Sequence, residues 1–232
     1  MDNKRGVIVD EESASRPAWI FDTDFRLPSK VCILAPGPNG KTHYADIPDD
    51  YTVLAVNKAV LIDAVEADAW LMNLADQAWF EAANAVFEGV RVFWREEPDS
   101  PDYNPAVEKR LSAAYTQNTY YFRIQRPGLD ENTMPLFSIT DMDHAILSGG
   151  TVSGAALQLA YHFDVREVLL CGVDMSGTTY WDGTVSEMEQ WHGDVWHSAK
   201  AVDFLIKEVL SKKGIIVTTL SPTRLDVPYW DG

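Results

Sequence analysis

The sequence is short of basic residues and has no long apolar run. It carries 19 Lys and Arg against 35 Asp and Glu, which gives a formal net charge of -16 at pH 7 and a pI near 4.5. A chain of this charge repels an extended polyanion, so we expect no general DNA or RNA binding. No stretch approaches the ~20 apolar residues of a membrane-spanning helix, and the first residues form no apolar signal-peptide core. We therefore expect a soluble, cytoplasmic protein with no membrane partner.

Cysteine is also scarce, because only Cys32 and Cys171 occur. Each lies within an apolar run, where a thiol is more often a small buried side chain than a ligand. The sequence has no Cys-x-x-Cys or His-x-Glu spacing, which disfavours a zinc site. These patterns predict two buried thiols and no resident metal.

The 232 residues, 46% of them hydrophobic, are enough to fill the core of one domain. From Val31 onward, short β-rich runs alternate with alanine-rich helical stretches, which is typical of β-α units in a mainly parallel sheet. Strands are predicted at 31–35, 52–56, 69–72, 90–94, 136–139, 167–173 and 215–220. Helices are predicted at 75–87, 106–115, 151–163 and 195–211, the last one ending at Lys212-Lys213-Gly214.

These elements predict an α/β fold, with a Rossmann-like, mainly parallel sheet and helices on both faces, in a single domain over residues 31–232. Residues 1–30 mix charges with isolated aromatics, and we expect an N-terminal arm that lies on the domain without forming a core element. The polar and aromatic segment of about 176–194 is too long for a simple turn and is expected to be a lid-like insertion.

The first predicted strand runs into a turn rich in glycine and proline. Ligands of open α/β sheets bind beyond the carboxyl ends of the strands, where glycine lets backbone N–H groups approach an anion. The turn therefore offers three candidate nucleotide-binding residues, Gly37, Pro38 and Asn39. An ordinary turn without a ligand is the alternative.

The same turn contains a near match to a P-loop. Gly40-Lys41-Thr42 fits the end of that motif, but Ala35 stands at its required first glycine. Pro48 also comes too soon for the long helix that normally follows. A P-loop kinase or NTPase is therefore disfavoured.

Two further predicted strands end on an asparagine, Asn57 and Asn73. An asparagine head group carries a donor and an acceptor that suit a base edge or a ribose, although capping of the following helix is the alternative at each position. The helix predicted from Thr151 begins with small residues, so its N–H groups and positive dipole end can meet a nucleotide closely. Its candidate residues are Gly149, Gly150, Thr151 and Ser153.

Asp174 follows the apolar strand 167–173 directly. The carboxyl end of a central strand is where a functional carboxylate would stand, so Asp174 is a candidate catalytic residue. A role as a turn or cap residue is the alternative.

Together, these motifs resemble a known superfamily. The residues that carry the resemblance are the turn at 35–39, Val-Asn-Lys-Ala at 56–59, the run from Ser148 to Asp174, Tyr180, and the run from His197 to Leu205. They look like the superfamily of bacterial family 42 sialyltransferases and MptE-like (DUF115) proteins. For the sialyltransferases, the resemblance implies that His197 is the general base and that Tyr180 assists the leaving phosphate. It also implies that Asn57, Asn73, Gly150 and Thr151 surround the cytidine and ribose.

Three functions are compatible with these observations. The first is a glycosyltransferase that resembles family 42, with a CMP-linked sugar as donor, a small or glycan acceptor and no metal cofactor. The second, implied by the MptE-like branch, is a 6-hydroxymethylpterin diphosphokinase-type transferase, in which Asp174 with Asp182 or Asp194 would hold Mg²⁺ between ATP phosphates. The third is a non-catalytic nucleotide-binding protein. The oligomeric state is left open, a homo-oligomer included.

Overall fold

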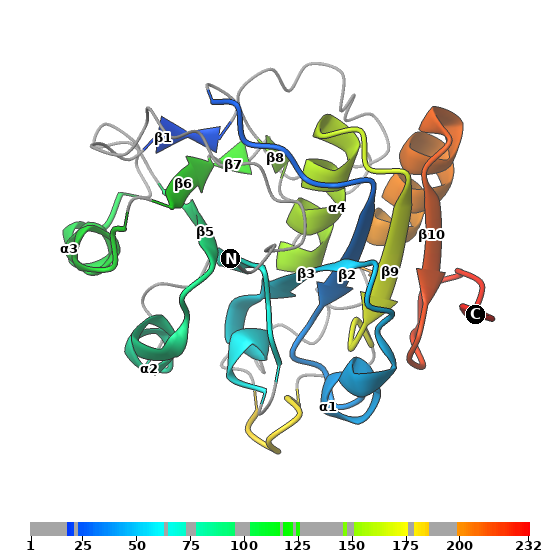
Figure 1. The fold of residues 1–232 in the computed structure, drawn as a ribbon, viewed down its shortest axis with the longest axis horizontal. Coiled ribbons are helices and arrows are strands. Elements are labelled where there is room, and N and C mark those ends of the chain that lie inside the picture. The colour runs from blue at the N-terminus through cyan, green and yellow to red at the C-terminus, as the bar shows by residue number, and fades with distance from the viewer. Residues whose placement is uncertain are drawn as a thin grey trace.

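An eight-stranded sheet forms the centre of the computed structural model (Figure 1). The structure describes residues 18–20, 23–62, 65–72, 78–95, 103–116, 118–122, 124–125, 146–147, 151–175, 179–185 and 199–232. The strand order is β1-β6-β5-β4-β3-β2-β9-β10, and all neighbouring strands are parallel. The strands are β1 (Ala18–Trp19), β2 (Lys30–Leu34), β3 (Thr52–Val56), β4 (Ala69–Met72), β5 (Val90–Trp94), β6 (Thr119–Phe122), β9 (Glu167–Cys171) and β10 (Ile216–Thr219). Two further strands, β7 (Ile124–Gln125) and β8 (Ile146–Leu147), form a separate parallel pair.

The central strands are buried on both faces, as a parallel sheet covered by helices requires. Along β2, Val31 and Ile33 belong to one hydrophobic cluster, whereas Cys32 and Leu34 belong to the other. The first cluster is covered by α4 (Val152–His162) and by the helix from residue 199 onward. The second is covered by the 3-10 helix η3 (Asn57–Leu61), α2 (Phe80–Val86) and α3 (Pro105–Ala113). The predicted parallel α/β fold with helices on both faces is therefore confirmed.

Two local predictions are also confirmed. Both cysteines are buried and free. Residues 199–204 are α-helical and continue as a π-helix (Leu205–Leu210) and a 3-10 turn (Ser211–Lys213). The helix ends at Gly214, whose φ of 81° is left-handed, so a glycine is favoured at this position.

The structure contains elements that hydrophobic periodicity did not indicate. Strand β6 pairs with β5 and β1, and neither β6 nor β1 was predicted. Contrary to an arm outside the core, Ile20 and Phe25 are fully buried. The centre of the Phe25 ring lies 5.0 Å from the centre of the Tyr120 ring and 5.1 Å from that of the Phe163 ring. Tertiary contacts therefore bury an aromatic side chain that belongs to no periodic run in the sequence. The predicted strand 136–139 lies outside the described residues.

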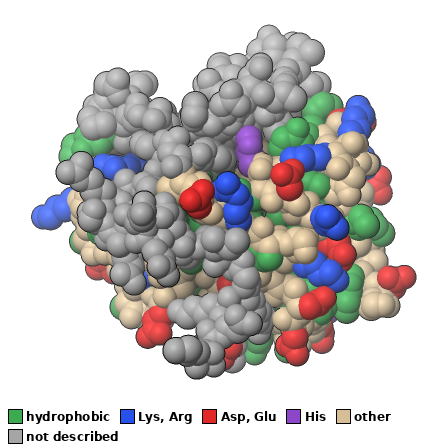
Figure 2. All heavy atoms as spheres, turned by 45° about the horizontal axis from the view of Figure 1, so that its top comes forward, with side chains coloured by type: hydrophobic (Ala, Val, Ile, Leu, Met, Phe, Trp, Pro, Cys, Tyr) green, Lys and Arg blue, Asp and Glu red, His purple; other side chains and the backbone are tan. Residues whose placement is uncertain are grey.

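Some of the charged side chains on the surface form local ion pairs. Lys30 contacts Asp50 at 3.0 Å and Glu167 at 3.3 Å, and Lys213 contacts Asp164 at 2.7 Å. Figure 2 shows basic and acidic side chains interspersed over the described part of one face. The described part of that face presents no large patch of a single sign.

Candidate functional site

The strand order places a topological switch point between β2 and β9. From β2 the chain runs outward through β3, β4, β5 and β6, whereas β9 and β10 lie on the other side of β2. After β2, Tyr44 and Ile47 pack against the second cluster, whereas after β9, Val202 and Leu205 pack in the first. Because the two connections leave toward opposite faces, the carboxyl ends of β2 and β9 frame the crevice where open α/β sheets bind ligands.

The turn after β2 packs backbone against backbone with the turn after β9. Gly37 N donates to Gly172 O at 3.1 Å, and a Cβ on Gly37 would lie 2.3 Å from that oxygen. Gly172 has a φ of 70°, and a Cβ there would lie 2.4 Å from Ala35 O. Both positions therefore require glycine for close approach of the two turns.

Backbone N–H groups of the glycine turn donate hydrogen bonds to other groups of the protein. Gly37 N donates to Gly172 O, Gly40 N donates to Gly37 O, and Asn39 N donates to Asp174 Oδ2 at 3.2 Å. The helix that follows, α1 (Gly40–His43), is only four residues long, which also argues against a P-loop. Gly37, Pro38 and Asn39 lie at the switch point, but the N–H groups of Gly37 and Asn39 are already bonded there, and Pro38 has none to offer an anion.

Asp174 lies at the switch point with half of its carboxylate unpaired. The residue is only 5% exposed; Oδ2 accepts the Asn39 N–H, whereas Oδ1 is buried without a hydrogen-bond partner among the described residues. Burial raises the pKa of Asp174, although the hydrogen bonds from Asn39 and the charge of His43 oppose this shift. A buried acceptor left unpaired costs about 1–3 kcal/mol, so this oxygen is poised to accept a ligand hydroxyl or amino group.

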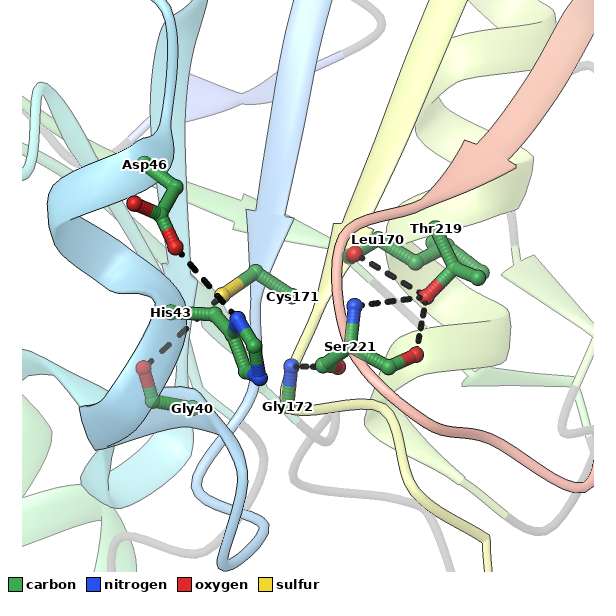
Figure 3. Close-up of polar contacts among 8 residues, drawn as sticks. All are labelled: Gly40, His43, Asp46, Leu170, Cys171, Gly172, Thr219 and Ser221. Carbon is green, nitrogen blue, oxygen red and sulfur yellow. Dashed lines mark hydrogen bonds and ion pairs between the residues drawn. The ribbon is translucent and has the colours of Figure 1, made fainter. Parts of the chain in front are cut away.

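Polar contacts from β10 and α1 hold the end of β9 in place (Figure 3). Gly172 N donates to Ser221 Oγ at 2.9 Å, and the Thr219 hydroxyl donates to Ser221 O at 2.7 Å. On the other side, the Cys171 thiol donates to Gly40 O in α1 at 3.8 Å. Beside this contact, His43 Nδ1 lies 3.4 Å from Asp46 Oδ2. The spacing of three between His43 and Asp46 in the sequence is the local signal for this pair.

The segment 179–185 brings Tyr180 to the same edge of the sheet. Trp181 N donates to Pro36 O at 3.0 Å, which fixes the segment to the turn after β2. Lys58, directly after Asn57 at the end of β3, donates to Asp182 and, at 2.8 Å, to Thr184 Oγ1. The Lys58 ammonium also lies 5.3 Å from the centre of the Tyr180 ring. Sequence reasoning missed Lys58 as a site residue, because its partners lie more than 120 positions away in the chain.

Asn57 does not cap the helix that follows it. It is the first residue of η3, and no side-chain cap is present there. Its φ of 48° is left-handed, its side chain is buried, and its carbonyl accepts the indole N–H of Trp70 at 2.8 Å. A non-glycine residue in this conformation is uncommon and is found preferentially at functional positions.

Thr151 caps α4, since Ser153 N donates to its hydroxyl at 3.3 Å. Ser153 itself is buried in the first turn. A short connection joins the end of α4 to the start of β9, and α4 packs on the sheet, so its N-terminus lies toward the carboxyl edge of the sheet. Four predicted site residues lie outside the described residues: Asn73, Gly149, Gly150 and His197.

An open cavity of about 540 Å³ lies next to the end of β9. The described residues that line it are Ala199, Lys200, Asp203 and Arg224. Arg224 N donates to Asp174 O at 3.0 Å, which connects the wall of the cavity to the switch point.

Within the described ranges, no group of three His, Cys, Asp or Glu side chains is placed to hold a metal ion. Nor does any helix in these ranges have the length and apolar character needed to span a membrane.

Comparison with known proteins gives structural matches only. No protein-family model and no curated protein matches this chain. The sialyltransferase CstII from Campylobacter jejuni, solved with the substrate analogue CMP-3FNeuAc, is 14% identical, with a TM-score of 0.47, over 84% of this chain and 82% of that one. A structure of CST-II with a trisaccharide acceptor and CMP is 15% identical, also with a TM-score of 0.47, over 83% of this chain and 82% of that one.

Proposed function

We propose that this protein is a nucleotide-dependent transferase of the sialyltransferase-like class, with a CMP-linked sugar as its donor. The observation that carries the proposal is the switch point between β2 and β9, where one buried carboxylate oxygen of Asp174 has no hydrogen-bond partner among the described residues. Such an oxygen suits a hydroxyl or amino group, both of which a nucleotide presents. The motif resemblance from Ser148 to Asp174 supports the choice of a nucleotide sugar.

The proposed reaction needs one base and one partner for the leaving group. The acceptor hydroxyl oxygen attacks the anomeric carbon, the bond from that carbon to the phosphate oxygen breaks, and the nucleotide leaves with the electron pair. His197 takes the hydroxyl proton, a contribution that is typically worth ~10²–10⁴-fold in rate. Tyr180 assists the departing phosphate, a role supported by its position over Lys58 at the carboxyl edge.

The Mg²⁺-dependent diphosphate transferase is a weaker fit to the described residues. It needs Asp174 together with Asp182 or Asp194, and Asp194 lies outside the described residues. Partial burial opposes ionisation of Asp182, but hydrogen bonds from Lys58 and Thr184 outweigh it and lower its pKa to about 2. Because both carboxylate oxygens of Asp182 are already bonded, this side chain is not a ready metal ligand.

A metal titration separates the two enzymes. We expect sugar transfer from a CMP-linked donor to persist in EDTA. Strict Mg²⁺ dependence with ATP as donor would instead establish the diphosphate transferase. Thermal-shift measurements with CMP, CDP, UDP and ATP test the non-catalytic alternative, since a ligand at 100 times its Kd stabilises the fold by about 2.7 kcal/mol. A shift without turnover would favour a binding protein, and no shift with any nucleotide would contradict the proposal.

The variant His197→Ala tests the proposed base. We expect it to bind the nucleotide with parental affinity and to lose transfer by ~10²–10⁴-fold. His162→Ala is the matched control, because His162 ends α4 at the opposite edge of the sheet. Transfer by the His197 variant at the parental rate would show that another group takes the proton.

A further inference from the structure

A nearly buried cation lies at the carboxyl edge of the sheet, outside the glycine turn. The side chain of Lys58 is 11% exposed, and it follows β3 and Asn57 directly. Its ammonium group donates to Asp182 and to Thr184 Oγ1, and lies over the ring of Tyr180. An ammonium group has three N–H donors, and its contacts with the described part of the chain use two of them, which leaves the third for a ligand.

The anion that pairs with Lys58 is carried by a small hairpin. Tyr180 N donates to Thr184 O at 2.8 Å, and Thr179 forms an antiparallel bridge with Val185. Thr184 also donates its hydroxyl to Asp182 at 2.6 Å, which holds that carboxylate in the hairpin turn. The hairpin is fixed to the end of β2 through Trp181 N and to the end of β3 through Lys58. Asp182 therefore places a carboxylate on the Lys58 ammonium, which lies over the Tyr180 ring.

A phosphate has no comparable place on the glycine turn. The N–H groups of Gly37 and Gly40 are bonded to backbone carbonyls, and that of Asn39 is bonded to the carboxylate of Asp174. A second anion beside Asp174 would be repelled. Lys58, in contrast, already binds an anion, and a phosphate offers more negative charge and more acceptor oxygens than a carboxylate.

We infer that Lys58 binds the phosphate of the nucleotide donor and that Asp182 is its internal competitor in the free protein. The inference rests on the proposed function, which places a nucleotide at this edge of the sheet. Asp182 forms an ion pair with Lys58 when no nucleotide donor is bound. When a nucleotide binds, its phosphate replaces the Asp182 carboxylate as the partner of Lys58. The two partners of one ion pair therefore have opposite effects on phosphate binding.

Isothermal titration with CMP, with cytidine and with inorganic pyrophosphate tests this assignment. We expect Lys58→Gln to weaken CMP binding by about 10-fold to 100-fold and to leave cytidine binding unchanged, because only CMP carries the phosphate. Lys58→Arg keeps the charge and should retain most of the CMP affinity. Asp182→Asn should tighten CMP binding severalfold, since it removes the competing anion. Lys30→Gln and Asp50→Asn, which remove one partner each from a more exposed ion pair at the opposite edge of the sheet, should change neither affinity.

The outcomes distinguish the inference from the proposed function. If Lys58→Gln and Asp182→Asn both weaken CMP binding equally, the pair is structural and the inference is wrong. Equal losses for CMP and cytidine in Lys58→Gln would also overturn it. If the parent protein binds pyrophosphate through Lys58 but binds no nucleotide, the proposed function is wrong, and only the phosphate-binding role of Lys58 stands, without its assignment to a nucleotide donor. Binding of neither pyrophosphate nor any nucleotide contradicts both.

Discussion

The buried carboxylate of Asp174 lowers the free energy of unfolding. Its carboxylate is buried, and within the described ranges one of its oxygens has no hydrogen-bond partner. The one charged side chain in those ranges that affects its pKa is His43, which is part-exposed. A buried carboxylate without an ion-pair partner destabilises the folded state at neutral pH. Side chains of this kind are typical of ligand sites, where the ligand supplies the missing interaction.

Replacement by the isosteric amide should therefore stabilise the free protein. In Asp174→Asn the amide oxygen can still accept the Asn39 N–H, and the buried charge is removed. We expect the free energy of unfolding at pH 7.5 to rise by about 1 kcal/mol, as measured by urea denaturation. Nucleotide binding should weaken in the same variant.

The pH dependence of this gain has a defined sign. Because burial raises the pKa of Asp174, the folded state holds this proton more tightly than the unfolded state. The penalty is absent below the unfolded pKa and grows as the pH rises through the folded pKa. The advantage of Asp174→Asn should therefore be largest at neutral pH and shrink on acidification. The exposed control Asp49→Asn should show no such trend, and a gain independent of pH would contradict the assigned cause.

Among single residues, the sequence predicts the site residues that directly follow the end of a strand. Asp174 and Asn57 were found because each ends an apolar run, and Gly37 because it follows one. Lys58 was not singled out, since its partner Asp182 is 124 residues away and nothing local marks the pair. The hydrogen bond from Gly37 N to Gly172 O could not be predicted from the sequence either, because its acceptor belongs to the turn after β9.

At the element scale, long apolar or periodic segments were predictable and short ones were not. Strands β2, β3, β4, β5, β9 and β10 were predicted from their composition, within a residue or two at each end for most of them. Strand β1 has only two residues, too few for a period to show. The strand order depends on contacts such as Leu34 with Cys171, which join positions far apart in the chain, so local patterns do not determine it.

The cap of α4 gives a prediction for a single element. Thr151 accepts the N–H of Ser153, and loss of a threonine cap typically costs about 1 kcal/mol. We expect Thr151→Ala to lower the free energy of unfolding by about that amount in the absence of ligand, measured by urea denaturation. The midpoint of thermal unfolding should fall by roughly 2–4 °C.

Thr151→Ser is the matched control for the cap. Serine keeps the hydroxyl that accepts the N–H group, so its stability should stay close to that of the parent. If Thr151→Ala has parental stability and loses only nucleotide affinity, the hydroxyl serves the ligand and not the helix. If both variants lose equal stability, the methyl group packing against its neighbours matters more than the cap.

At the scale of the whole molecule, the acidic charge is unevenly distributed. Residues 42–105 contain 13 Asp and Glu against 3 Lys and Arg, so they hold -10 of the formal net charge of -16. In the described part of the chain, ion pairs such as Lys30 with Asp50 and Lys213 with Asp164 neutralise individual groups (Figure 2). Each pair joins one charge of each sign, so the net charge of -16 is unchanged. The resulting self-repulsion is stronger in the compact state than in the unfolded chain.

Salt should therefore act in opposite directions on folding and on ligand binding. Raising NaCl from about 20 mM to 300 mM shortens the Debye length to below 10 Å and screens the repulsion, so the unfolding midpoint of the free protein should rise by a few degrees. Choline chloride at equal ionic strength is the control, because screening does not depend on the identity of the cation. Affinity for CMP should fall over the same range, since Lys58 meets the phosphate through charge. A midpoint that falls with salt would mean that attractive pairs, and not the net charge of -16, dominate the electrostatics of this fold.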